Sequence, residues 1–581
     1  MRFRRWRVLA LLAALAVITA ACGGGDAEEE TGAEELAEGQ ADDETEAADA
    51  EEEPAEGETF VFGTTADPAV LDGVLVSDGE SLRAIDQMFE GLVATAPGST
   101  EIEPLLATEW DVNDEGTVWT FQLQEGVTFH DGEPFNADAV CFNFDRWYNF
   151  SGSFQNPDAT YYWQTVFGGF ADIEPEFAES VPEDSLYDSC EAVSDTEVTI
   201  NLTRNSASFL PSLALKNFSF ASPAALEEYG ADEGEVDEEG IFRPTGAYGT
   251  EHPTGTGPYM FEEWDIGTRL IMTRNPDYWG EFPGNISTLI FQPIPDNAAR
   301  LQALQSGEIS GYDFVEPVDF GAIEGDDGLQ LLDRPAFNVG YLGFNQADPV
   351  LQNLDVRQAI AHAIDREELV EAFYEGQGEV ATQFMPPELF GYSEDVTTYE
   401  YDPGLAQQLL EESGEQLPIT LDFAYPTDVS RPYMPDPQAN FEAMRADLEA
   451  AGFVINPISA PWSPDYLSGV ETGQYDLYLF GWTGDFGDPD NFVGTFFQEP
   501  SAQFGFDSPE LFAALDEAEQ ETDEDARVGL YEEINVQIMD FLPGLPYVHT
   551  QPALAFEAEV EGYQPSPVTL EPFADVTVGG R

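Results

Sequence analysis

The sequence predicts an α/β protein folded into two lobes. About 520 of the 581 residues follow an acidic N-terminal segment, and a chain of that length is long for one hydrophobic core. Strand patterns dominate the first part of this body, whereas helices alternate with strands in the second. Aromatic residues make up 13% of the chain, so it has ample material for two large cores.

The N-terminus has the order of an export signal. Four arginines within residues 2–7 precede an apolar run at 8–21 that is too short to span a bilayer permanently. Two alanines then stand before Cys22 and three glycines follow it, which resembles a bacterial lipobox, although Thr19 occupies a position that is usually aliphatic. We expect a signal peptide at 1–21 and a lipidated Cys22. An ordinary signal peptide with an incidental cysteine is the alternative.

An acidic segment follows the signal. Residues 26–58 contain 17 acidic side chains and no basic one, with alanine and glycine making up most of the rest. Like charges repel one another there, and little apolar surface is available to bury. We therefore expect residues 22–58 to form a lipid anchor and a disordered tether.

The charge balance is strongly negative along the whole chain. There are 114 acidic and 19 basic residues, for a formal charge of −95, and Lys216 is the single lysine. Nucleic acid is excluded as a partner, because its phosphates would be repelled. Such a surface suits a saline habitat in which counterions screen the self-repulsion. An ordinary acidic bias is the alternative.

Three cysteines are present, and assigning Cys22 to lipid leaves Cys141 and Cys190. In an oxidising compartment this pair is expected to form a disulfide, with two buried free thiols as the alternative. The chain has no CxxC or HExxH pattern, and its four histidines lie far apart in sequence. We expect no metal site and no cofactor.

The spacing of apolar residues and one N-cap predict the first strands and the first helix of the body. Residues 119–124 and 198–202 alternate apolar with polar side chains, as half-buried strands do. Asn136 is a plausible N-cap for a helix that continues to Tyr148 and carries Cys141.

Helix caps and stops become frequent after residue 295. Asp296 or Asn297 begins a helix that Gly307 ends. Three more helices and a strand are expected: a helix capped by Asp355 that stops near Gly376, one after Asp402 that Gly414 closes, one at 439–451, and a strand at 475–480.

Five strings carry a resemblance to a known family. They are FHDGEPFNADAV at 129–140, GTGPY at 255–259, NPDYW at 275–279, LDVRQAIAHAIDRE at 354–367 and GWTGDFGDPDNF at 481–492. Each alone marks an ordinary turn or helix. Their order and spacing resemble the family 5 extracellular solute-binding proteins, which include dipeptide, oligopeptide and nickel receptors. The resemblance runs from about Phe60 to Phe573.

The resemblance implies a two-lobed, periplasmic-binding-protein-like fold of type II that closes like a hinge. The first lobe would hold an extra subdomain, and the C-terminal segment would return to it. The implied segments are lobe I at 59–325, lobe II at 326–543 and the return at 544–581. The implied function is that of a monomeric, lipid-anchored receptor on the extracytoplasmic face of the membrane, which hands a short peptide to the permease of an ABC importer.

Two segments are similar to ligand-binding segments of dipeptide-binding members. SRPYMPDP at 430–437 matches the segment that supplies an arginine to the ligand carboxylate, which makes Arg431 the candidate here. GWTGDFGDP matches the segment whose first aspartate takes the ligand's α-amino group, which makes Asp485 the candidate. A ligand sealed between lobes needs both partners, because its charges lose their water. A surface role for Arg431 and a turn role for Asp485 are the alternatives.

Aromatic residues near these two candidates are candidate lining residues of the cleft. These candidates for the cleft lining are Tyr433, Trp462 and Trp482, and the alternative is that they are buried in the core. In the string at 354–367 the apolar face is regular, so we expect a packing helix in which Arg357 and Asp365 make structural ion pairs.

Two other functions compete with the peptide receptor. A secreted hydrolase finds no support, because no GxSxG, SxxK or HExxH pattern occurs. We expect no enzymatic activity. A receptor of the same fold for a nickel chelate, haem or an oligosaccharide stays open, because a fold does not determine its ligand.

Overall fold

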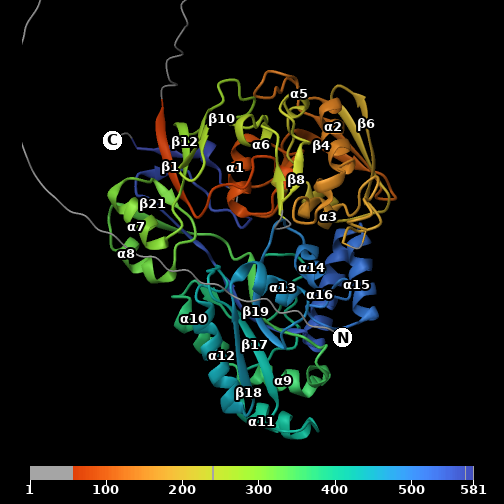
Figure 1. Cartoon of the computed structure of the whole chain (residues 1–581), viewed down its shortest axis with the longest axis vertical. Coiled ribbons are helices and arrows are strands. Elements are labelled where there is room, and N and C mark those ends of the chain that lie inside the picture. The colour runs from red at the N-terminus through yellow and green to blue at the C-terminus, as the bar shows by residue number, and fades with distance from the viewer. Residues whose placement is uncertain (1–56, 179, 238–240, 569–570, 580–581) are drawn as a thin grey trace, which may run out of the picture. The chain divides into compact units, whose positions relative to one another are not determined.

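The computed structural model describes residues 57–178, 180–237, 241–568 and 571–579. In this part of the chain, no helix combines the length and the apolar character that crossing a membrane requires. The predicted signal peptide, Cys22 and nearly all of the acidic tether lie outside the described residues. The body folds as two lobes, each built around its own sheet (Figure 1).

Lobe I contains a seven-stranded sheet. Its strands, in spatial order, are β10 (Tyr259–Asp265), β11 (Arg269–Arg274), β12 (Ile286–Pro293), β1 (Glu58–Thr64), β13 (Gly311–Tyr312), β21 (Ala553–Glu557) and β14 (Leu329–Asp333). Strand β1 runs parallel to β12 and β13, and the other pairs are antiparallel. The C-terminal segment thus returns to lobe I and completes its sheet.

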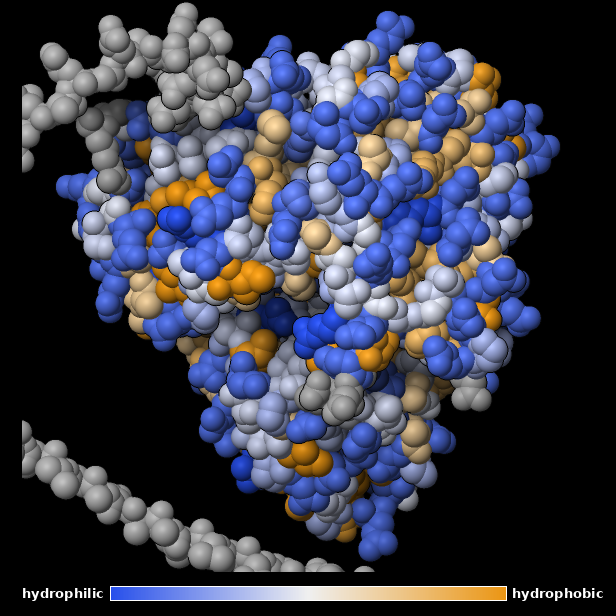
Figure 2. Space-filling model, turned by 45° about the horizontal axis from the view of Figure 1, so that its top comes forward, coloured by the Kyte–Doolittle hydropathy of each residue, from blue (hydrophilic) through white to orange (hydrophobic). Residues whose placement is uncertain are grey.

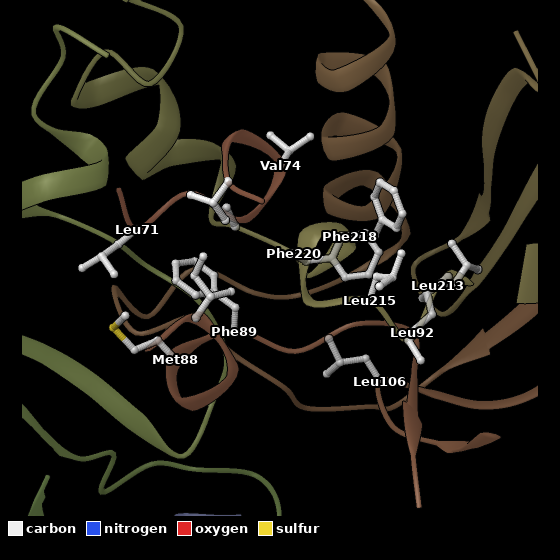
Figure 3. Packing of buried hydrophobic residues seen from close by; sticks show 14 of the residues in the cluster. Leu71, Val74, Met88, Phe89, Leu92, Leu106, Leu213, Leu215, Phe218 and Phe220 are labelled. Atoms are coloured by element: carbon white, nitrogen blue, oxygen red, sulfur yellow. The ribbon is translucent and has the colours of Figure 1, made fainter. Parts of the chain in front are cut away.

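Two hydrophobic clusters include side chains of this sheet. One joins α1 (Gly79–Met88) to loops before and after it, where residues such as Leu71, Phe89 and Phe220 pack together (Figure 3). The other joins α7 (Asn297–Ser306) and α8 (Phe320–Glu324) to β13 and β21.

An extra subdomain is inserted into lobe I. Its antiparallel sheet has the order β4 (Ala107–Val112), β5 (Val118–Leu123), β7 (Glu197–Leu202) and β6 (Tyr187–Ser194). Helix α2 (Ala137–Tyr148) packs on β6, and the Asn136 side chain caps it by accepting a hydrogen bond from the Ala139 N–H, as predicted. A disulfide joins Cys141 on α2 to Cys190 on β6, with 5.2 Å between their Cα atoms.

We expect no alkylatable thiol in a Cys22→Ser chain that is denatured without reductant, because Cys141 and Cys190 are then the only cysteines and are bonded to each other. The chain-entropy model assigns this crosslink about 4 kcal/mol of stability. Mass spectrometry after iodoacetamide treatment measures the thiols, and the reduced protein, which should take up two labels, is the control. Two labels without reductant would contradict the pairing.

Lobe II contains a six-stranded sheet. Its strands are β16 (Gly378–Glu379), β20 (Gly544–Thr550), β15 (Asn338–Phe344), β19 (Leu477–Thr483), β17 (Thr420–Pro426) and β18 (Val454–Ala460). Strands β17, β18 and β19 are parallel, while β15 runs antiparallel to β19 and pairs Asn338 with Thr483. Because only four residues, 334–337, separate β14 from β15, the carboxyl ends of the three parallel strands lie where the chain enters from lobe I.

The structure confirms several predicted caps. Asp296 caps α7, whose C-cap Gly307 is left-handed, and Asp402 caps α11 (Pro403–Glu412). Helix α12 (Pro437–Ala451) ends at Gly452 as predicted but starts two residues earlier than expected, because Asp436 caps it.

One prediction of a single long helix from Asp355 to about Gly376 is wrong. The segment forms α9 (Leu354–Ala363), capped by Asn353, and then α10 (Arg366–Phe373). The break arises because Ile364 is extended and the Asp365 side chain accepts a hydrogen bond from the Glu368 N–H, which caps a second helix.

The remaining helices and strands complete the two lobes. The helices are α3 (Tyr161–Val166), α4 (Phe209–Ser212), α5 (Pro223–Glu228), α6 (Tyr248–Glu251), α13 (Leu467–Glu471), α14 (Val493–Phe497), α15 (Pro509–Gln520) and α16 (Glu524–Phe541). The strands are β2 (Val93–Thr95), β3 (Ile102–Pro104), β8 (Gly234–Val236), β9 (Phe242–Pro244), β22 (Val560–Glu561) and β23 (Thr577–Val578).

The chain crosses between the lobes later than the sequence indicated. Strand β14 belongs to the sheet of lobe I, so lobe I extends past the expected boundary at residue 325. Strand β20 belongs to the sheet of lobe II, so lobe II extends past residue 543. The crossings lie at 334–337 and 551–552, between strands that pair in different sheets.

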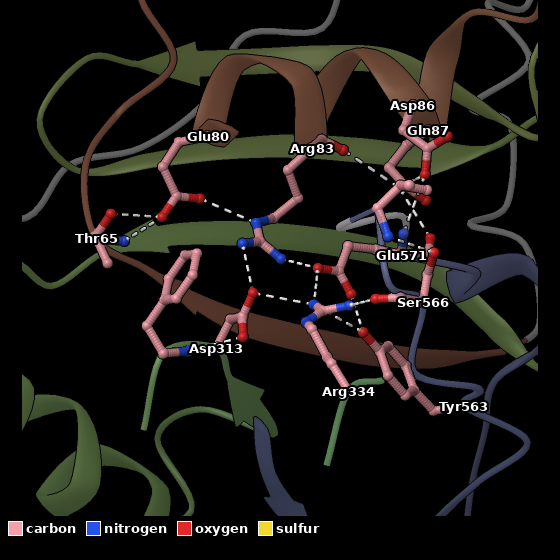
Figure 4. Close-up of polar contacts among 12 residues, drawn as sticks. Thr65, Glu80, Arg83, Asp86, Gln87, Asp313, Arg334, Tyr563, Ser566 and Glu571 are labelled. Atoms are coloured by element: carbon pink, nitrogen blue, oxygen red, sulfur yellow. Dashed lines mark hydrogen bonds and ion pairs between the residues drawn. The ribbon is translucent and has the colours of Figure 1, made fainter. Parts of the chain in front are cut away.

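A buried ionic network lies beside these crossings (Figure 4). Arg334, at the first crossing, contacts Asp313 at 3.0 Å and Glu571 at 2.6 Å. Arg83 on α1 pairs with the same two carboxylates, and Tyr563 donates its hydroxyl to Glu571. Burial alone would raise the pKa of Asp313, but the two guanidinium groups outweigh it and hold that pKa below its usual range. The network ties α1 to the first crossing through Arg334 and to the C-terminal segment through Glu571.

Several motif residues hold lobe I together and lie outside the candidate ligand site. Glu90 is buried and accepts hydrogen bonds from Thr256 in GTGPY and from Tyr278 and Trp279 in NPDYW. His130 in FHDG is hydrogen-bonded to the backbone of residues 255–257, and burial lowers its pKa to about 4.

The expectation of structural ion pairs in the 354–367 segment is wrong. Arg357 donates to the backbone carbonyls of Leu351, Phe541 and Leu542, and Asp365 acts as a helix cap. These carbonyls lie at the ends of helices, where no further helical N–H reaches them, and Arg357 supplies their hydrogen bonds. The segment is thus a packing element, as expected.

Candidate functional site

Three loops of lobe II meet at the carboxyl edge of its sheet. One loop follows β17 and carries Arg431, one follows β18 and carries Trp462, and one follows β19 and carries Asp485. Parallel strands end at the same edge, and ligands of open α/β sheets bind there. A hollow is visible at the boundary between the lobes, with strongly hydrophilic side chains beside it (Figure 2).

Asp485 is held by neutral hydrogen-bond donors. Its carboxylate accepts a hydrogen bond from the Tyr162 hydroxyl at 2.8 Å and one from the Asn491 amide at 3.4 Å. Its own backbone N–H donates to the Asn491 side-chain oxygen at 2.7 Å. Within the described residues no arginine or lysine forms an ion pair with it. Burial raises the pKa of Asp485 to about 6, although the two hydrogen bonds oppose the rise.

The loop around Asp485 bridges the lobes. Tyr162 lies on α3 in lobe I, and Phe486, which is 7% exposed, packs in the hydrophobic cluster of lobe I. Gly487 lies so close to Thr100 of lobe I that a side chain would clash with it. Asp485 is therefore placed between the lobes, and its bonds to Asn491 also hold its own loop, as in the alternative turn role.

Arg431 is exposed, and no carboxylate in the described part of the chain pairs with it. It belongs to a tight turn in which the Arg431 N–H donates to the Met434 carbonyl, and the Met434 N–H donates to the Arg431 carbonyl. Its guanidinium carbon lies 5.1 Å from the centre of the Trp462 ring, within range of a cation–π interaction. Although the chain has 114 acidic residues, none in the described part forms an ion pair with Arg431. The side chain is therefore available to an anionic ligand group.

The two tryptophans at this edge are half-buried. Trp462 stacks on Phe480, with 5.7 Å between ring centres. The Trp482 ring N–H donates to the Asn491 side-chain oxygen at 3.4 Å, so Trp482 and Asp485 are held by the same residue.

Tyr433 occupies a different place from the one expected. Only 6% of its surface is exposed, and its ring packs so tightly on Gly481 that a side chain there would clash. Its backbone carbonyl accepts hydrogen bonds from the hydroxyls of Tyr374 and Tyr547. Tyr433 therefore supports the turn that carries Arg431, because it is packed beneath that turn.

The sequence did not identify Tyr162 or Asn491 as site residues. Tyr162 lies in the aromatic string YYW at 161–163, where nothing local distinguishes a side chain that crosses to the other lobe from one in the core. Asn491 was inside a quoted motif, but its spacing of six residues from Asp485 gave no reason to pair them.

Within the described residues, the site has a carboxylate without a cationic partner and a cation without a carboxylate partner, an arrangement that is complementary to a dipolar solute. Among the described residues, no group of three or more histidine, cysteine, aspartate or glutamate side chains is placed to hold a metal ion.

We expect the affinity for ligands with a free amino group to fall as the pH drops through about 6. An ammonium group is attracted to the ionised form of Asp485, and the raised pKa means that this form is lost below about pH 6. Binding then has to release a proton, so the affinity should fall by up to about tenfold per pH unit. Calorimetry between pH 5 and 8 measures this effect.

The matched control for the pH experiment is Asp485→Asn, which should show no such fall because it has no proton to release. N-acetylated ligands should likewise give a flat profile on the unmodified protein. A fall of equal size in Asp485→Asn would show that another group titrates.

Comparisons with known proteins agree with this architecture. The family model of bacterial extracellular solute-binding proteins, family 5, matches residues 101–504. The chain is 31% identical over 533 residues to the dipeptide-binding protein of Escherichia coli (strain K12), which covers 89% of this chain and 94% of that protein.

Two further relatives extend the comparison. Heme-binding protein A of Haemophilus influenzae is 31% identical over 536 residues, covering 90% of this chain and 92% of that protein. The crystal structure of a dipeptide-binding protein from Pseudoalteromonas sp. SM9913 in complex with Met-Leu has a TM-score of 0.73 and 25% identity. The superposition covers 90% of this chain and 100% of the Pseudoalteromonas chain.

Proposed function

Because the chain belongs to family 5 of the bacterial extracellular solute-binding proteins, we propose that it captures a short peptide between its lobes and delivers it to the permease of an ABC importer. The observation that carries the proposal is the pair of unmatched charges at one edge of lobe II. Among the described residues, the half-buried carboxylate of Asp485 has only neutral donors, and the cationic Arg431 has no carboxylate partner. A peptide with free termini supplies the missing charge to each, Asp485 facing its ammonium and Arg431 its carboxylate.

Two observations on relatives support a peptide as the ligand. A relative that is 31% identical over nearly its whole length is named a dipeptide-binding protein, and a structurally similar protein was solved with Met-Leu. The strongly negative charge of the chain fits as well, because it repels anionic solutes and tolerates zwitterions.

Calorimetry with blocked peptides tests the proposal. Free dipeptides should bind, N-acetylated dipeptides and C-terminal amides should each bind more weakly, and doubly blocked dipeptides should bind weakest. Equal affinities for free and doubly blocked dipeptides would overturn the assignment of both charges.

A haem or metal-chelate receptor is the second candidate, because Heme-binding protein A of Haemophilus influenzae is as similar in sequence as the dipeptide-binding relative. Titration with haemin and with a nickel–histidine chelate, beside dipeptides, separates the candidates. Mass spectrometry of small molecules that copurify with the protein gives an independent answer. Incubation with dipeptides should leave them intact, since we propose a receptor without hydrolytic activity.

We expect Cys22→Ala to release the protein from the membrane, since the proposed anchor is a lipid on that cysteine and the described residues contain no membrane-spanning helix. Fractionation of cells followed by immunoblotting measures the released share. Cys190→Ala, which removes a cysteine elsewhere, is the control and should stay with the membrane. Equal membrane association of Cys22→Ala and the unmodified protein would refute the anchor.

The proposal also covers the location, the oligomeric state and the protein partner of the receptor. We place the receptor on the extracytoplasmic face of the membrane as a monomer, with the permease as its protein partner. Light scattering of the purified protein tests the monomer.

A further inference from the structure

An apolar cavity lies beside Arg431, where both lobes and the returning chain meet. It has a volume of about 60 Å³, and Arg431 forms part of its wall. The apolar lining includes Phe314, Val315 and Phe320 from lobe I, Pro432 and Pro435 from the segment that carries Arg431, and Ala553 from the returning strand β21. The cavity thus continues the candidate site away from the carboxyl edge of the sheet and toward the crossings.

Three polar side chains in the cavity wall, those of Tyr374, Gln377 and Thr550, already have protein partners. The Tyr374 hydroxyl donates to the Tyr433 carbonyl at 2.9 Å, and the Thr550 hydroxyl bonds the Asn338 side-chain oxygen at 3.0 Å. The Gln377 amide donates to Asp333 at 2.9 Å. A polar ligand group that entered here would lose water without finding a free partner at these positions, whereas an apolar group would gain from burial.

Charges at the cavity wall fix the orientation of a ligand. Arg431 attracts a carboxylate, and in a peptide the carbon next to the terminal carboxylate bears the side chain of the last residue. That side chain is therefore brought to the cavity when Arg431 holds the carboxylate. Glu316 also lies in the wall, so an acidic side chain would be repelled.

We infer that this cavity receives the side chain of the ligand's carboxyl-terminal residue and selects a small aliphatic one, such as that of alanine or valine. The inference rests on the proposed function, because it needs a peptide carboxylate on Arg431. Size sets the upper limit: a cavity of about 150 Å³ is known to admit benzene, and the volume here is well below that.

The test is calorimetry of the purified protein with the dipeptides Ala-Gly, Ala-Ala, Ala-Val, Ala-Phe, Ala-Asp and Ala-Lys. Each buried methyl or methylene group should raise the affinity roughly fourfold, so Ala-Val should bind at least about tenfold more tightly than Ala-Gly. Ala-Phe, Ala-Asp and Ala-Lys should all bind more weakly than Ala-Val.

Two variants change the cavity in opposite directions. Phe320→Leu shortens a lining side chain and should shift the preference toward Ala-Leu and Ala-Phe. Ala553→Val fills the cavity and should bring the affinity for Ala-Val down to that for Ala-Gly. Ile323→Val is the matched control, because Ile323 is buried on the same helix as Phe320 but does not line the cavity, and its preferences should not change.

Three results would overturn the inference. Equal affinities for the whole series would show that the last side chain does not enter the cavity, while the peptide-receptor function would stand. Tightest binding of Ala-Lys would show that Glu316 selects a cation. If no peptide binds at all, both the inference and the proposed function fall.

Discussion

Replacing Asp485 with alanine is expected to weaken the binding of a free dipeptide by about 2 to 5 kcal/mol, because the ligand's ammonium group would be buried without its counter-charge. Arg431→Ala should weaken binding by a similar amount, because the ligand's carboxylate would then lack its counter-charge. N-acetylation should lower the affinity on the unmodified protein but cause little further loss on Asp485→Ala. Amidation should behave likewise with Arg431→Ala. Calorimetry of both variants against free and blocked dipeptides measures these couplings.

The structure supplies controls for both substitutions. Arg274, in lobe I, is also exposed and lies over an aromatic ring, Phe282, at 4.0 Å, so Arg274→Ala removes a comparable arginine away from the site and should leave the affinity unchanged. Tyr162→Phe removes only one hydrogen bond to Asp485 and should weaken dipeptide binding by about 1 kcal/mol. An unchanged affinity in both Asp485→Ala and Arg431→Ala would place the ligand elsewhere in the molecule.

Arg334→Met is expected to lower the free energy of unfolding by about 3 to 5 kcal/mol. Arg334 is 2% exposed, and its removal leaves Asp313 and Glu571 in the interior with Arg83 as the remaining cation. The methionine fills much of the volume, so the loss reports the uncompensated charge more than a cavity. Urea unfolding followed by tryptophan fluorescence measures it.

A second substitution and a surface control sharpen the test of this network. Adding Glu571→Gln to Arg334→Met removes the unmatched negative charge and should recover part of the loss. Arg445 on α12 is partly exposed and pairs with Glu442 and Glu449, and Arg445→Met should lower the free energy of unfolding much less than Arg334→Met does. Equal losses in Arg334→Met and Arg445→Met would show that burial of the network adds nothing to stability.

Local sequence patterns predicted the elements whose ends are set by their own side chains. Asn136, Asp296 and Asp402 each cap the helix that the pattern assigned to them. The pattern failed at residue 365, because an apolar face that continues through two helices does not reveal a break between them. Only the extended backbone at Ile364 and the second cap show it.

The lobe boundaries depend on strand pairing that the sequence does not contain. Strand β14 ends only five residues before β15 begins, yet the two belong to different sheets. A short stretch of residues such as 334–337 carries no composition signal that it leaves one lobe for the other. The family resemblance therefore placed the crossing only approximately.

The candidate site was partly accessible from the sequence. Arg431 and Asp485 follow from the resemblance of their segments to those of peptide receptors, and the structure brings their loops to one edge of a sheet. Tyr433 was misplaced because an aromatic side chain beside a site looks the same in sequence whether it lines the cleft or supports it. Tyr162 was missed because it comes from the other lobe, some 320 positions away from Asp485 in the chain.

The insertion of Phe486 into lobe I bears on how long a captured solute stays bound. Any opening of the lobes has to withdraw this ring from the lobe I cluster and break the contact between Tyr162 and Asp485. Exposing a buried phenylalanine costs about 1.5 to 3 kcal/mol, which corresponds to a roughly 10- to 150-fold slower opening if the whole cost falls on the barrier. A contact within the protein, that of Phe486 with lobe I, would then contribute to the residence time of a bound solute. If the chain delivers its solute to a permease as proposed, a permease that binds the open arrangement more tightly than the closed one would offset this cost.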